Sequence, residues 1–167
     1  VGKHLYARTA WATVINTPPS IQSLDLSPAD VYTNTNVIAS VTASDIDGDS
    51  VSIGYAWYVN GDVAQQGTDS SLNGSYFEVG DEISVIATAY DGRDYGAAEQ
   101  SSTVDVLNSL PVIQQHVLFS EDPIRRGAVV SCNADVDDND STQSLSINYL
   151  WQDQSGTVLS TSELLDI

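Results

Sequence analysis

The chain has 167 residues and a formal net charge of −18, because its 23 acidic residues face only 5 lysines and arginines. A chain this negative repels nucleic acid and anionic membranes, and its sequence holds no apolar run long enough to cross a bilayer. We therefore expect no nucleic-acid partner and no membrane insertion in this segment. The single cysteine excludes an intrachain disulfide.

About seven segments of the complete central part of the chain alternate apolar and polar residues, which is the pattern of half-buried β-strands. No stretch combines a helical period with helix caps. The predicted strands, in chain order, are Ser20–Leu26, Val37–Ser44, Val51–Val59, Asp62–Gln66, Leu72–Phe77, Ile83–Tyr90 and Gly96–Leu107. The dipeptide Asn60-Gly61 predicts a type I′ hairpin turn between the third and the fourth of them.

The large apolar residues of the third predicted strand share one parity. Trp57 has the parity of Ile53 and Tyr55, which favours a core position, and the same reasoning predicts that Trp151 is buried. Turn signals between the strands and the lack of crossover helices predict an all-β fold. We expect an immunoglobulin-like β-sandwich with about seven antiparallel strands.

Three motifs recur in the same order with a spacing of roughly 90 residues, close to the size of one sandwich domain. They are Asn16–Pro19 and Asn108–Pro111, Asp45–Asp49 and Asp135–Asp140, and Tyr55–Trp57 and Tyr149–Trp151. We interpret the chain as tandem repeats. The register predicts that residues 1–16 are the C-terminal strand of a preceding repeat, 17–107 a complete repeat, and 108–167 a following repeat without its last strands.

These motifs, in this order, resemble the PKD-like and cadherin-like repeats of prokaryotic surface and secreted proteins. The resemblance covers the complete repeat and both fragments. It implies an immunoglobulin-like fold, an extracellular or cell-surface location, and neighbouring repeats of the same chain or fibre as partners. The residues that carry it are Asn16–Pro19, Ser44–Asp49, Tyr55–Trp57, Ala89–Gly92 and Val104–Asn108.

The aspartate loop before each tryptophan strand is a candidate metal site. Asp45, Asp47 and Asp49 stand at alternate positions, and carboxylate oxygens are the ligands that calcium prefers. The spacing is not that of an EF-hand. In an immunoglobulin-like sandwich this loop lies at the same end as the incoming linker and the loop after the sixth strand. The predicted calcium ligands are Asn16, Asp45, Asp47, Asp49, Asp91 and Asp94 at the first linker and Asn108, Asp135, Asp137 and Asp140 at the second. The alternative is an Asp- and Gly-rich solvated turn.

Catalysis finds little support in the sequence. No nucleophile elbow, phosphate-binding glycine loop or zinc spacing is present, and the two histidines, His4 and His116, fall in different partial repeats. We expect a non-enzymatic, calcium-rigidified stalk or adhesion spacer of a surface protein. Two alternatives stay open. One is a binding module for a cell-surface glycan or protein, with Tyr58, Tyr90 and Tyr95 as an aromatic patch; the other is a subunit of a self-assembling filament completed by strand exchange.

Overall fold

The structure is a computed structural model that describes residues 11–114, 118–119, 126–140 and 143–166. Apart from one turn of 3-10 helix, η1 (Gly74–Tyr76), its regular elements are β-strands, which confirms the predicted all-β class. Within the described ranges no helix is both long and apolar enough to span a membrane. His4 and His116 lie outside these ranges.

The described chain forms two compact units. Unit 1 consists of the described part of Val1–Ala29 together with Val37–Leu72 and Ile83–Thr103. Unit 2 consists of Asp30–Asn36, Asn73–Glu82 and the described part of Val104–Ile167. The predicted repeat boundaries after residues 16 and 107 stay a prediction.

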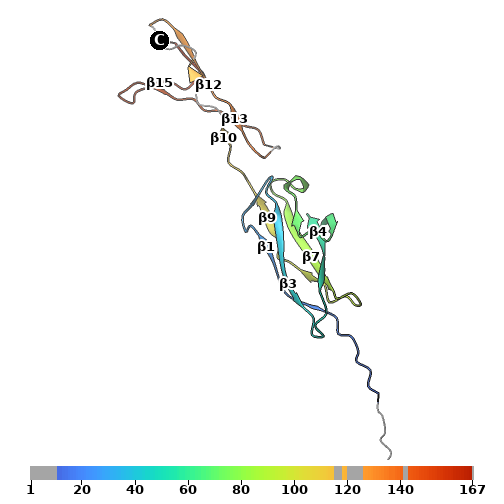
Figure 1. Cartoon of the computed structure of the whole chain (residues 1–167). Coiled ribbons are helices and arrows are strands. Elements are labelled where there is room, and N and C mark those ends of the chain that lie inside the picture. The colour runs from blue at the N-terminus through green and yellow to red at the C-terminus, as the bar shows by residue number, and fades with distance from the viewer. Residues whose placement is uncertain (1–10, 115–117, 120–125, 141–142, 167) are drawn as a thin grey trace, which may run out of the picture. The chain divides into compact units, whose positions relative to one another are not determined.

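Two antiparallel sheets build unit 1, as in a β-sandwich (Figure 1). The first sheet has the strand order β1-β3-β6, and in the second sheet β4 lies between β5 and β7, with β8 paired to β7. The bounds are β1 (Ser20–Ser27), β3 (Val37–Ser44), β6 (Ser71–Leu72), β4 (Ser52–Val59), β5 (Asp62–Gly67), β7 (Glu82–Tyr90) and β8 (Glu99–Gln100).

Two kinds of sequence prediction are confirmed in unit 1: strands predicted from regular alternation of apolar and polar residues, and the hairpin turn predicted from its positive-φ dipeptide. The bounds of β3 are those predicted, and β1 extends one residue beyond its prediction. Asn60 and Gly61 both adopt positive φ, at 53° and 83°, as the type I′ turn between β4 and β5 requires. Strand β4 is paired with β7 along the whole length of β4, from Ser52 opposite Tyr90 to Val59 opposite Ile83.

The single strand predicted over Gly96–Leu107 is wrong, because the ladder is interrupted at Ser101. This residue donates its N–H to Val85 O at 2.9 Å, and its hydroxyl oxygen accepts the N–H of Val85 at 3.0 Å. A side-chain oxygen thus takes the place of a backbone carbonyl, and the segment splits into β8 and β9 (Val104–Leu107). Leu72–Phe77 likewise becomes the end of β6 followed by η1 rather than one strand.

The core of unit 1 is formed by buried side chains of the neighbouring strands β4 and β7 in the second sheet and of β3 and β6 in the first. Trp57 is 0 % exposed, which confirms the parity argument, and its indole N–H donates to Asp69 O at 3.3 Å. Strand β7 alternates cleanly, with every second side chain fully buried. These buried β7 residues are Ile83, Val85, Ala87 and Ala89.

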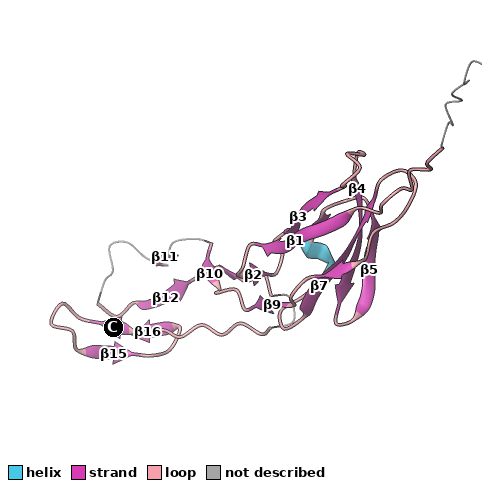
Figure 2. Ribbon diagram, turned by 90° about the horizontal axis from the view of Figure 1, so that it is seen from below, coloured by secondary structure: helices cyan, strands magenta, loops and turns pink. Residues whose placement is uncertain are grey.

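Unit 2 contains short strands, most of them antiparallel (Figure 2). Its pairs are β10 with β13, β12 with both β11 and β16, and β14 with β15. The bounds are β2 (Val31–Tyr32), β10 (Val112–Ile113), β11 (Leu118–Phe119), β12 (Val129–Asn133), β13 (Val136–Asp137), β14 (Trp151–Gln152), β15 (Val158–Ser160) and β16 (Leu164–Asp166).

One pairing in unit 2 departs from the antiparallel expectation. Strand β2 runs parallel to β9, with Val31 opposite Val106 and Tyr32 opposite Leu107. Val31 and Val106 are both buried. The alternation of apolar residues shows which face of a strand is buried but not the direction of its neighbour, so the sequence pattern carried no signal for a parallel pair.

Candidate linker sites

The amide of Asn16 ties the first linker to the loop after β7. Its Nδ2 donates to Asp91 Oδ2 at 2.9 Å and to Asp94 Oδ2 at 2.8 Å. The loop presents these carboxylates because Asp91 Oδ1 accepts the backbone N–H groups of Arg93 and Asp94, both at 2.7 Å. Such a side-chain-to-backbone turn holds its aspartate in one orientation. Asn16, Asp91 and Asp94 therefore lie together, as the sequence predicted.

The aspartate loop between β3 and β4 holds the next linker residue. Asp45 Oδ1 accepts the N–H of Asp47 at 2.7 Å, and Gly48 continues the curl with a φ of 82°. Asp47 then points its Oδ2 at the backbone N–H of Thr17, at 2.6 Å. Asp49 is exposed and contributes only its backbone N–H, 3.5 Å from Asp45 Oδ1. Two acidic loops thus hold two consecutive linker residues.

Two oxygen atoms at this first linker site are buried without a hydrogen-bond donor among the described residues. They are Asn16 Oδ1 and Asp45 Oδ2. A buried oxygen without a donor is costly, and carboxylate and amide oxygens are suitable calcium ligands. However, no three His, Cys, Asp or Glu side chains of the described ranges come close enough to form a metal-binding group. The three carboxylates Asp45, Asp47 and Asp49 do not converge on one centre.

The pKa of Asp91 is held below its ordinary value, first by the Asn16 side chain and then by the backbone N–H groups of Asp94 and Arg93. These donors favour the ionised carboxylate. Because the folded-state pKa is depressed, the stabilisation is complete above the unfolded-state pKa of about 3.9. It is lost as the pH falls through the folded-state value.

We therefore expect wild-type stability to fall more steeply in acid than that of the Asp91→Asn variant, because the variant has no carboxylate to protonate at this position. Thermal unfolding from about pH 6 to about pH 2 measures both slopes. Asp25→Asn, at an exposed position of β1, makes the same charge change away from the linker and is the control. Identical slopes for wild type and Asp91→Asn would contradict the assigned role.

The second linker site repeats half of this geometry. Asp138 Oδ1 accepts the N–H of Asp140 at 2.9 Å, and Asp140 Oδ2 accepts the N–H of Ser109 at 2.7 Å. Asp138 and Asp140 therefore do here what Asp45 and Asp47 do at the first site. Asp138 was not among the predicted ligands. The Asp-x-Asp spacing shared by the two loops was the signal that would have found it.

The remaining predicted residues of the second site are arranged differently. Asp135 and Asp137 are exposed and bond to Gln114, through the carbonyl O of Asp135 at 2.8 Å and Oδ2 of Asp137 at 3.3 Å. Asn108 accepts a hydrogen bond from Gln143 Nε2 on its Oδ1. Among the described residues, no carboxylate accepts a hydrogen bond from the Asn108 amide in the way that Asp91 and Asp94 accept one from Asn16.

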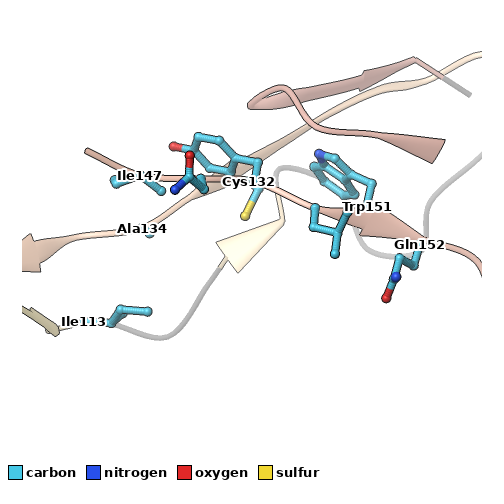
Figure 3. A pocket seen from close by; sticks show the side chains of 9 residues that line it. Ile113, Cys132, Ala134, Ile147, Trp151 and Gln152 are labelled. Carbon is cyan, nitrogen blue, oxygen red and sulfur yellow. The ribbon is translucent and has the colours of Figure 1, made fainter. Parts of the chain in front are cut away.

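An open apolar pocket of about 370 Å³ lies within unit 2 (Figure 3). Trp151 lines the pocket and is only half-buried, so its predicted core position is wrong. Its indole N–H donates to Ser162 O at 2.9 Å, as the indole N–H of Trp57 donates to Asp69 O. The described residues immediately before Trp151, 143–150, form no strand. The other side chains that Figure 3 labels are Ile113, Cys132, Ala134, Ile147 and Gln152.

Comparison with known proteins adds no assignment: no protein-family model matches the chain, and no curated protein matches it.

Proposed function

We propose that this chain is a non-enzymatic spacer segment of an extracellular or cell-surface protein, built from tandem immunoglobulin-like repeats, in which calcium stiffens a linker. Neighbouring repeats of the same chain or fibre are its partners. One observation carries the proposal: consecutive linker residues, Asn16 and Thr17, are held by two acidic loops, and the same place leaves two buried oxygens without donors.

The residues present fit a hard cation in donor type. Asn16 Oδ1 and Asp45 Oδ2 are the oxygens that lack a donor, and the carboxylates of Asp91 and Asp94 already meet the Asn16 amide. A bound calcium ion supplies two positive charges and draws oxygen ligands from separate segments towards one point. At a net charge of −18 it also relieves repulsion among carboxylates. Linker and loops then move as one body.

Calcium is expected to raise the thermal stability of the full chain. At a free concentration one hundred times the Kd, a ligand that binds only the folded state stabilises it by about 2.7 kcal/mol. Asp45→Asn removes the negative charge from the carboxylate whose Oδ2 lacks a donor and should abolish most of this gain. Calorimetric titration gives the affinity and differential scanning calorimetry the stability.

Asp25→Asn is again the matched control, since it removes one negative charge from an exposed strand position. It should leave the calcium response intact. An unchanged melting temperature in saturating calcium, or an equal loss of response in the two variants, would contradict the proposal and favour solvated turns.

Ligand binding is the second candidate function. The rings of Tyr90 and Tyr95 stack with centroids 4.5 Å apart, and Tyr95 is 69 % exposed. A supported, exposed aromatic ring suits stacking on a sugar or packing against a protein. Exposed apolar side chains at Trp11, Val14 and Ile15 favour the filament alternative in the same way. Both require affinity for another molecule, which the spacer role does not.

A further inference from the structure

Asp140 is the most deeply buried acidic side chain of the described chain, with 1 % of its surface exposed. Both of its carboxylate oxygens are occupied. Oδ1 accepts the hydroxyl of Thr33 at 2.7 Å, and Oδ2 accepts the backbone N–H of Ser109 at 2.7 Å. Burial of a carboxylate is unfavourable unless donors replace its water. Here two donors replace the water directly.

The loop that carries Thr33 is itself fixed before it reaches Asp140. Thr35 N–H donates to Tyr32 O at 3.0 Å, and Asn34 takes a positive φ of 66°. Gly74 packs so closely on this turn that a Cβ there would stand 2.5 Å from the Asn34 carbonyl carbon. The hydroxyl is therefore presented by a rigid turn, and little order is lost when it bonds to the carboxylate.

The opposite side of the contact is also held in place. The Asp138 side chain fixes the backbone of Asp140 through a 2.9 Å bond, and Ser109 is the second residue of the linker motif. The carboxylate therefore joins three segments far apart in sequence: the Thr33 turn, the linker and the aspartate loop. Hydrogen bonds to a charged acceptor are stronger than those between neutral groups.

We infer that Asp140, Thr33 and Ser109 form a hydroxyl–carboxylate latch that immobilises the second linker without a metal ion. Among the described residues neither Asp140 oxygen is left without a donor, whereas the first site leaves the amide oxygen Asn16 Oδ1 and the carboxylate oxygen Asp45 Oδ2 unpaired. The unpaired buried atom at the second site is the hydroxyl Oγ of Ser109, which carries no charge. The two linkers therefore differ in kind. The first responds to calcium and the second does not; this contrast rests on the proposed function, but the latch itself does not.

Hydrogen exchange of the Ser109 amide tests the latch in the full chain, with a chelator present throughout. The amide of the wild type should be protected. Thr33→Val keeps the shape of the side chain but removes the hydroxyl, and it should accelerate exchange by about tenfold or more, the effect of losing a hydrogen bond to a charged group. Thr33→Ser restores the hydroxyl and should restore most of the protection. Thr42→Val, at an exposed position of β3, is the control and should change nothing.

A double-mutant cycle separates the latch from general loosening. Asp140→Asn should accelerate exchange by itself, and adding Thr33→Val should then have little further effect, because the two residues act on one amide through one contact. Fully additive effects would overturn the latch, as would unchanged exchange in Thr33→Val. An unprotected Ser109 amide in the wild type with chelator present would also overturn the latch, because it would show that the linker is not held without a metal ion. If calcium fails to raise the melting temperature, or if Asp45→Asn and Asp25→Asn lose the calcium response equally, the proposed function is refuted. The exchange results for the latch are unaffected, because they are measured without calcium.

Discussion

Trp57→Ala is expected to lower the free energy of unfolding by about 3–5 kcal/mol, the usual cost of emptying a tryptophan-sized volume in a core. Trp57 is fully buried, and its indole N–H bonds to the carbonyl O of Asp69. The substitution creates a cavity and leaves that carbonyl without its donor. Urea unfolding of the full chain, followed by circular dichroism, measures the change.

Trp11→Ala is the matched control, since Trp11 is 91 % exposed and its replacement should change stability by about 0.5 kcal/mol or less. A similar loss in both variants would mean that tryptophan content, rather than burial, dominates the measurement. A loss below about 1 kcal/mol for Trp57→Ala would contradict the core assignment.

Gly96→Ala is the second large expected effect, a destabilisation of about 3 kcal/mol from overpacking. A Cβ at this position would lie 2.0 Å from the backbone oxygen of Pro19, and Pro19 itself is buried. The clashing atom belongs to the backbone of Pro19 and not to a flexible side chain, so the backbone must move. The 2.9 Å bond from Gly96 N–H to Ala89 O would be strained by the same movement. Thermal unfolding of the variant measures the loss.

Gly54→Ala tests whether any alanine in place of glycine would do the same. The nearest atoms to a Cβ there are the carbonyl oxygens of Gly67 and Thr88, both at the ordinary contact distance of 3.9 Å. Its stability should stay within about 1 kcal/mol of the wild type, because reduced chain entropy and altered packing oppose each other. Equal losses in the two variants would contradict the steric argument.

The proximity of Pro19 to Gly96 also bears on the first linker. The loop between β7 and β8 meets the linker at two places. Its carboxylates Asp91 and Asp94 accept hydrogen bonds from Asn16, and its Gly96 lies against the backbone of Pro19. The close backbone approach at Gly96 therefore helps to place the Asn16 amide on its carboxylates. Gly96→Ala should weaken the calcium response of the chain as well as its stability.

The sequence predicted unit 1 well because its signals are local. Alternation gave β3 its bounds, and the parity of Trp57 placed it in the core. Asn60-Gly61 specified a turn whose positive φ values few other dipeptides accept. At the first linker, the order of the predicted strands placed the linker and the loop after the sixth strand at one end of the sandwich. This predicted that Asn16 lies close to Asp91 and Asp94.

Other features depended on partners remote in sequence. The parallel pairing of β2 with β9 and the interruption of the last predicted strand by the Ser101 hydroxyl follow from contacts that no local pattern records. The half-buried state of Trp151 belongs to the same class, because strand parity predicts burial only where a facing layer covers the strand.

The sequence by itself determined the all-β class, the main strands of unit 1, the hairpin turn and the acidic character that makes cations plausible partners. These depend on side-chain alternation, backbone preference and charge, which are properties of neighbouring residues. Only the tertiary structure decided which oxygens have donors. Asp45 and Asp140 stand in similar Asp-rich segments, yet one keeps an unpaired oxygen and the other receives the Thr33 hydroxyl. That difference arises because hydrogen bonds are satisfied by whichever donor the fold brings within reach, however distant in the chain.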